Sequence, residues 1–75
     1  MRIKNPTSIQ SLFGAHIKKL RMQSGLSQEA FADQCGLDRT YISGIERGVR
    51  NPTLAVISVL AKGLDVPLKA LFDFT

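Results

Sequence analysis

The chain has 75 residues, one cysteine and a formal net charge of +4, and this length limits it to a single domain. One cysteine excludes an internal disulfide, no Cys/His cluster has metal-ligand spacing, and no apolar run reaches the roughly 20 residues that span a membrane. Since no signal-peptide pattern opens the chain either, we expect a cytoplasmic protein without a metal or cofactor.

The charge is unevenly distributed along the chain. Residues 1–50 contain eight Lys or Arg against four Asp or Glu, whereas residues 51–75 contain two of each kind. This excess is either ordinary solubility charge or the mark of a polyanionic partner, and its position favours nucleic acid. A chain this short buries only about 60% of its unfolded surface, so we also expect a second copy to stabilise it.

Residues 1–7 have little periodicity and contain Pro6. They predict an N-terminal arm, which is either a frayed end or a segment that reaches along DNA. The domain proper would then cover residues 8–75.

A first helix is predicted from residue 8 to residue 23 or 24, because its apolar residues form one stripe: Ile9, Leu12, Phe13, Ile17 and Leu20. Gly14 weakens this helix by roughly 1 kcal/mol, so we expect close packing by a neighbour there. His16 is isolated and predicts a surface or half-buried side chain rather than a metal ligand or a base.

A second helix is predicted over residues 28–35. Ser27 precedes it as an N-cap, and Gly36 follows it where a left-handed conformation ends a helix. Phe31 is its main apolar anchor. Cys35 is interpreted as a packing residue rather than a redox sensor, because the chain has no second thiol to resolve it.

The predicted helix at residues 39–47, capped by Asp38, has an unusual polar face. At about 100° per residue, Ile42 and Ile45 mark the buried side. The opposite side carries small hydrogen-bonding residues with an arginine at each end: Arg39, Thr40, Ser43, Gly44 and Arg47. Such a face suits insertion into the major groove of B-DNA, and we expect Gly44 to permit a close approach.

These motifs resemble the phage-repressor and Cro type of helix-turn-helix proteins, the Xre family. The matching segments are Gly25-Leu26-Ser27-Gln28-Glu29, Gly36-Leu37, residues 41–48 and Arg50-Asn51-Pro52-Thr53. Residues 38–51 are especially similar to the controller proteins of restriction–modification systems. The resemblance implies an all-α fold, a compact five-helix lambda-repressor-like domain, with DNA as the partner.

The resemblance and the chemistry of the side chains assign a set of DNA contacts. Base contacts are expected from Arg39, Thr40 and Ser43. An arginine guanidinium can donate two hydrogen bonds to the two acceptors of guanine, and a threonine offers a hydroxyl and a methyl group. Phosphate contacts are expected from Ser27, Gln28, Tyr41, Arg47, Arg50 and Asn51. For Gln28 and Arg50, an exposed polar residue and a solvated loop charge remain the alternatives.

An ion pair is expected between Arg21 and Glu46. In the resembling family an arginine at the end of the first helix pairs with a glutamate at the end of the recognition helix. Independently, Glu46 lies on the flank of its helix nearer the core, where an unpaired carboxylate would be costly.

The last third of the chain predicts a helix over residues 54–64, capped by Thr53, and a short fifth helix that starts at Pro67. The core face of the first would carry Leu54, Ile57, Leu60, Ala61 and Leu64, and a second apolar strip would carry Val56 and Val59. We assign the homodimer surface to Val56, Val59, Phe72 and Phe74, with folding of Phe74 onto its own core as the alternative.

The sequence therefore predicts a sequence-specific transcriptional regulator that binds double-stranded DNA. It would bind as a homodimer to a pseudo-palindromic operator with half-sites about 10 bp apart, as a restriction–modification controller or an autoregulated repressor. No small-molecule ligand, no membrane and no catalytic residues are expected, because the chain lacks a nucleophile–base pair and a carboxylate pair. The alternatives are an antitoxin of a toxin–antitoxin module and a protein-interaction adaptor that kept the fold.

Overall fold

The computed structural model describes residues 8–74, and within this range it is all-α. The helices are α1 (Ile9–Gln23), α2 (Gln28–Cys35), α3 (Arg39–Glu46), α4 (Leu54–Leu64) and the 3₁₀-helix η1 (Leu68–Phe72). The all-α prediction is confirmed. The fifth helix forms as expected in position, but it is a 3₁₀-helix of five residues rather than an α-helix. The predicted arm at residues 1–7 lies outside the described residues.

Side-chain caps fix where the helices begin. The hydroxyls of Ser8, Ser27 and Thr53 each accept a hydrogen bond from the backbone N–H three residues later. Asp38 caps α3 by accepting from the N–H of Thr40 at 2.9 Å. Each cap satisfies one backbone donor that the first helical turn leaves free. At the other end of α2, Gly36 has φ of 68°, the left-handed conformation predicted for it.

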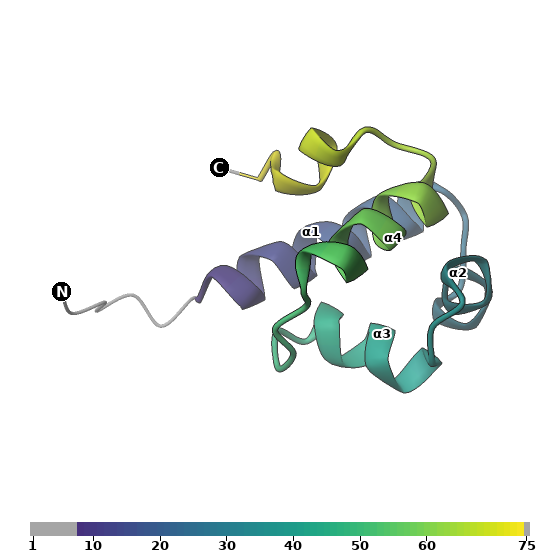
Figure 1. Ribbon diagram of the computed structural model, residues 1–75, viewed down its shortest axis with the longest axis horizontal. Helices are drawn as coiled ribbons and strands as arrows, with labels where there is room; N and C mark the ends of the chain where they lie inside the picture. Colours follow the sequence, from purple (N-terminus) through teal and green to yellow (C-terminus); the bar gives the residue numbers. More distant parts are fainter. Residues whose placement is uncertain (1–7, 75) are drawn as a thin grey trace, which may run out of the picture.

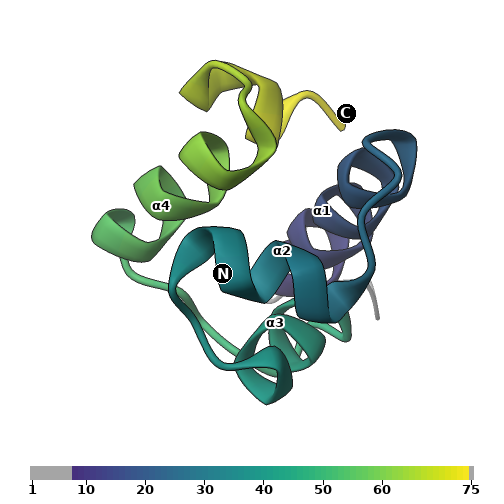
Figure 2. The same cartoon turned by 90° about the vertical axis from the view of Figure 1, so that its right-hand side faces the viewer.

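The helices enclose one core (Figures 1 and 2). Helix α1 packs on α3 and η1, while α2 packs on α3 and α4. The largest fully buried side chains are Phe31, Ile17, Ile42, Ile45, Leu60 and Leu71. In both views α3 lies at the bottom of the molecule and η1, in yellow-green, lies at the top. The two elements are therefore at opposite ends of the domain.

Gly14 and Gly48 allow α1 to approach α3 closely. A Cβ atom at Gly14 would overlap the backbone carbonyl oxygen of Ile45, so the expected close neighbour is the backbone of α3 itself. Gly48 follows α3 with φ of 80° and lies against Ser11. The end of α3 thus rests on α1 with no side chain between the two backbones.

His16 is more buried than the sequence predicts. Its Nε2 atom donates to the carbonyl oxygen of Ala70 at 2.7 Å, and its ring lies 5.7 Å from that of Phe74. The side chain links α1 to the C-terminal segment and leaves little surface to solvent.

Cys35 packs between α2 and α4, as the sequence predicts. Its Sγ atom lies 3.8 Å from the carbonyl oxygen of Val59, and Gly63 leaves room for it. Burial raises the pKa of the Cys35 thiol, so the reactive thiolate is disfavoured.

The expected core face of α4 is wrong at its first residue, and the apolar stripe of α1 is exposed at its start. Leu54 is 83% exposed, Ile9 is 61% exposed and Leu12 is 37% exposed. These residues lie in the first turn of their helices, where the neighbouring elements leave them in contact with solvent. Helical periodicity finds the apolar side of a helix, but it does not show how far the covering neighbour extends.

Candidate nucleic-acid interface

Helix α3 has an accessible front and a buried back. Arg39 and Thr40 are exposed and Ser43 is half-buried, while Ile42 and Ile45 on the other side are fully buried. The front therefore consists of side chains that can donate or accept hydrogen bonds, and nothing in residues 8–74 covers its N-terminal turn. This is the geometry that base readout in a major groove requires.

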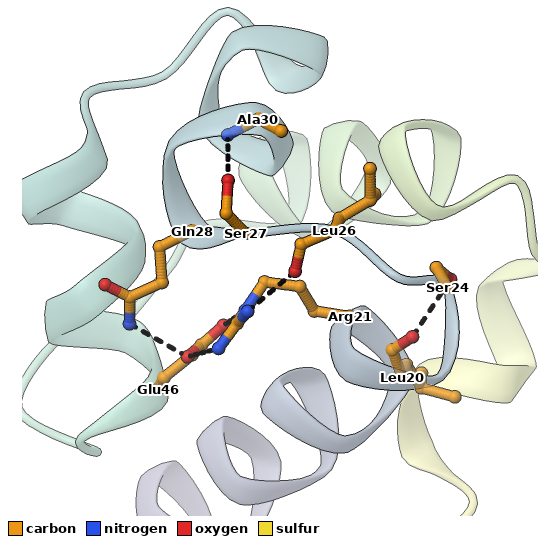
Figure 3. A network of polar contacts seen from close by, with 8 residues as sticks. All are labelled: Leu20, Arg21, Ser24, Leu26, Ser27, Gln28, Ala30 and Glu46. Atoms are coloured by element: carbon orange, nitrogen blue, oxygen red, sulfur yellow. Dashed lines mark hydrogen bonds and ion pairs between the residues drawn. The ribbon is translucent and has the colours of Figure 1, made fainter.

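A buried network holds the C-terminal end of α3 (Figure 3). The guanidinium of Arg21 donates from Nε and Nη2 to the two carboxylate oxygens of Glu46, at 2.7 and 3.0 Å. Its Nη1 atom donates to the carbonyl oxygen of Leu26 at 2.8 Å. The ion pair expected at these positions is thus present as a two-pronged contact, the strong form of this interaction. It ties α3 to the end of α1 and to the turn before α2.

Gln28 belongs to the same network, which the sequence did not indicate. Its Nε2 atom donates to Oε1 of Glu46 at 3.0 Å (Figure 3). The side chain is half-buried and leans toward Glu46 rather than extending freely into solvent. A third donor on Glu46 matches the burial of that carboxylate, since a buried charge needs its lone pairs satisfied.

Arg50 lies along α3 and fills the space that Gly44 leaves. Its side-chain atoms sit where a Cβ of Gly44 would be, and its guanidinium carbon lies 5.9 Å from the ring centre of Tyr41. Gly44 is consequently buried. The expectation that Gly44 lies open to the groove is wrong in this structure, because a side chain from the following loop occupies that place.

Arg47 continues the row of basic residues. Its Nε atom donates to the hydroxyl of Ser43 at 3.3 Å, so the arginine side chain lies along the exposed side of α3. Arg39, Arg47 and Arg50 are all exposed. Three of the eight basic residues in residues 1–50 therefore lie exposed along α3 and the loop after it.

Asp38 makes two hydrogen bonds with one residue of the exposed face. Its Oδ1 atom accepts from the backbone N–H of Thr40 and also from the Thr40 hydroxyl, at 2.9 and 2.7 Å. These two bonds and the nearby charge of Arg39 lower the pKa of Asp38. The sequence identified Asp38 as a cap but gave no signal for the second bond, which depends on the rotamer of Thr40.

The part of the chain that the structure describes has neither a metal-binding cluster nor a membrane-spanning helix. Residues 8–74 contain no group of three His, Cys, Asp or Glu side chains that could hold a metal ion. Over the same range, no helix combines the length and the apolar character needed to cross a membrane.

Comparison with known protein families gives a match over most of the chain. The model of a family described as "Helix-turn-helix" (HTH_3) matches residues 17–71. The chain is also 48% identical over 69 residues to the control protein C.BamHI of Bacillus amyloliquefaciens, which covers 91% of this chain and 85% of that protein.

Solved structures give the same result. The restriction–modification controller protein C.AhdI from Aeromonas hydrophila is similar with a TM-score of 0.83 and 46% identity, over 84% of this chain and 96% of that one. The controller protein C.Esp1396I, crystallised as a tetramer in complex with its natural 35-base-pair operator, has a TM-score of 0.81 and 43% identity over 88% of each chain.

Proposed function

This chain belongs to the helix-turn-helix family, and from that premise we propose that it is a sequence-specific DNA-binding transcriptional regulator. One observation carries the proposal: α3 presents an accessible face of hydrogen-bonding side chains while Arg21, Glu46 and Gly14 hold its C-terminal end rigidly against α1. A rigid helix with such a face can read base edges, because base contacts depend on fixed positions of donors and acceptors.

Bases are contacted in this proposal by Arg39, Thr40 and Ser43. Arg39 is exposed at the first residue of α3, where its two-pronged guanidinium can reach O6 and N7 of guanine. Thr40 lies in the same turn and Ser43 one turn later, which lets them reach neighbouring base pairs.

Phosphates are contacted by residues that surround this face. The set is Ser27, Gln28, Tyr41, Arg47, Arg50 and Asn51. For Arg47, Arg50 and Asn51 the support is their exposure on α3 and the loop behind it. For Ser27 and Gln28 it is their position at the start of α2, where backbone N–H groups attract an anion. Gln28 would contact a phosphate with the part of its amide that Glu46 leaves free.

The protein acts as a homodimer in this proposal, on a pseudo-palindromic operator with half-sites about one helical turn apart. The assigned surface is Val56, Val59, Phe72 and Phe74. Val56 and Phe74 are half-buried against their own core, whereas Phe72 is 45% exposed, and Leu54 and Leu68 are exposed as well. We therefore extend the surface to Leu54 and Leu68, because association is driven mostly by apolar area that the monomer leaves in water.

The relatives' names indicate which genes such a regulator controls. Since the relatives of this chain include the control protein C.BamHI and the restriction–modification controller protein C.AhdI, we infer that this chain is a controller of the same kind or an autoregulated repressor. Its output would follow its own concentration through dimerisation and operator occupancy. Such a regulator works in the cytoplasm, where its operator is.

The test is a mobility-shift titration of the intact protein on DNA selected from a random library. Arg39→Ala should weaken binding to the selected sequence by about tenfold or more, because one good arginine–guanine pair is worth roughly 1–3 kcal/mol. Binding of random DNA should change little. The matched control is Lys18→Ala, an exposed basic residue on α1.

Salt provides the second readout. The logarithm of the binding constant should fall linearly with the logarithm of salt concentration, by about 0.9 for each phosphate neutralised. If wild-type protein selects no sequence, the proposed function is wrong. If it also fails to bind random DNA at low salt, a protein-interaction adaptor is the better interpretation.

A further inference from the structure

Thr40 has its hydroxyl proton engaged inside the protein. Its Oγ1 atom donates to Oδ1 of Asp38 at 2.7 Å, and this Asp38 oxygen also accepts from the Thr40 backbone N–H at 2.9 Å. A hydroxyl carries one proton and two lone pairs. With that proton directed at Asp38, the group can offer DNA its lone pairs and its neighbouring methyl group, but no donor.

Asp38 cannot become the hydrogen-bond donor to the Thr40 hydroxyl at neutral pH. The two hydrogen bonds from Thr40 and the charge of Arg39 keep the pKa of Asp38 below its usual range. An ionised carboxylate only accepts hydrogen bonds. Asp38 and Thr40 are both exposed beside each other, so the carboxylate also adds a negative charge next to the hydroxyl.

We propose that Asp38 fixes Thr40 as a hydrogen-bond acceptor, so that Thr40 selects a base with an exocyclic amino group in the major groove and rejects guanine. This inference rests on the proposed function. Adenine and cytosine carry such an amino group, whereas guanine presents two acceptors there. An A·T pair fits best, because its thymine also presents a methyl group in the major groove, which the Thr40 methyl group can contact.

The same geometry argues against a phosphate as the ligand of Thr40. Phosphate oxygens only accept hydrogen bonds, and the hydroxyl has no proton left to give. The adjacent Asp38 carboxylate repels a phosphate as well. Asp38 is thus a specificity-determining residue that acts through Thr40, a role beyond capping α3.

The first experiment locates the base pair that Thr40 reads. Wild-type protein and the Thr40→Val variant, which replaces the hydroxyl by a methyl group of similar size, are each used to select duplexes from a random library. The base pair whose preference is lost in Thr40→Val is the one contacted. If wild type selects no sequence, the proposed function is overturned and this inference with it. If Thr40→Val selects as wild type does, only this inference is overturned.

The second experiment tests the polarity of the contact. At the located position, the preferred adenine is replaced by the purine analogue that lacks the exocyclic amino group, or cytosine by its corresponding analogue. Wild-type affinity should fall about fivefold, the value of one ordinary hydrogen bond, whereas Thr40→Val should lose less than twofold. A preferred guanine at this position, with affinity lost on removal of its O6 or N7 atom, would overturn the proposal.

The third experiment isolates Asp38 with two variants. Asp38→Gly removes the acceptor and keeps a tolerable cap, while Asp38→Asn removes the charge and keeps the acceptor. Discrimination against guanine at the located position should fall to within about twofold in Asp38→Gly and persist in Asp38→Asn. Circular dichroism checks that both variants are folded. Full discrimination in folded Asp38→Gly would contradict the role assigned to Asp38.

Discussion

Glu46 shows how a single charged residue can fix the orientation of a recognition helix. It is buried, and its two oxygens receive three hydrogen bonds, two from Arg21 and one from Gln28. Burial of a charge is unfavourable unless it is paired. The pairing therefore stabilises one docked position of α3, because any displacement of that helix would leave the buried carboxylate without its hydrogen-bond donors.

We expect Glu46→Ala to destabilise the fold by about 3–5 kcal/mol, because Arg21 would remain buried without its counter-charge. A domain of this size has little more stability than that, so the variant should be largely unfolded at 25 °C in a urea titration. Glu29→Ala, which changes an exposed acidic residue, is the control and should shift stability by less than about 0.5 kcal/mol. A double-mutant cycle with Arg21→Ala that gives no coupling energy would contradict this account.

At the scale of elements, α3 is positioned by backbone contact as well as by side chains. Gly14 of α1 has no room for a Cβ because the Ile45 carbonyl lies there, whereas the space beside Gly44 is filled by the flexible side chain of Arg50. Both glycines lie inside helices, where alanine is intrinsically preferred by about 1 kcal/mol. The environment of Gly14 should reverse that preference for alanine, whereas the environment of Gly44 should leave it in place.

Gly14→Ala should therefore destabilise the protein by more than about 2 kcal/mol, since one backbone must move away from the other. Gly44→Ala should leave stability unchanged or raise it by up to about 1 kcal/mol, because Arg50 can swing aside. It should also weaken DNA binding, since the displaced Arg50 leaves its place beside Tyr41. Thermal unfolding and mobility shift measure the two effects. Equal destabilisation by both variants would show that the two neighbours are equally rigid.

At the scale of the whole molecule, the reading helix α3 and the η1 part of the proposed dimer surface lie on opposite sides of the domain. Helix α3 lies at one end of the domain and η1 at the other (Figures 1 and 2). A second copy can therefore cover Leu68 and Phe72 without covering Arg39 or Thr40. In the proposed function, this separation would let one small domain bind its partner and its operator simultaneously.

Leu54→Glu and Leu68→Glu should each raise the dimer dissociation constant at least tenfold, because they place a charge in the proposed apolar contact. Both residues are largely exposed, so the monomer fold should be retained. Met22→Glu is the matched control, since Met22 is 61% exposed near the far end of α1. Sedimentation equilibrium gives the constants. Unchanged association in both Leu variants would move the dimer surface elsewhere.

The sequence by itself determined the elements and the identity of the reading helix. Caps such as Ser27 and Asp38, the turn at Gly36 and the face opposite Ile42 are local features, because each depends on residues within a few positions of one another. The ion pair between Arg21 and Glu46 could also be predicted from the sequence, through the family resemblance and the energetic cost of an unpaired carboxylate.

Only the tertiary structure decided how these elements meet. The exposure of Leu54, the third donor that Gln28 gives to Glu46, and the Arg50 side chain over Gly44 depend on helix ends and rotamers. Helical periodicity carries no information about where a neighbouring helix stops or which way a side chain turns. Those outcomes follow from packing between segments that are distant in the chain, and packing is settled by the whole core at once.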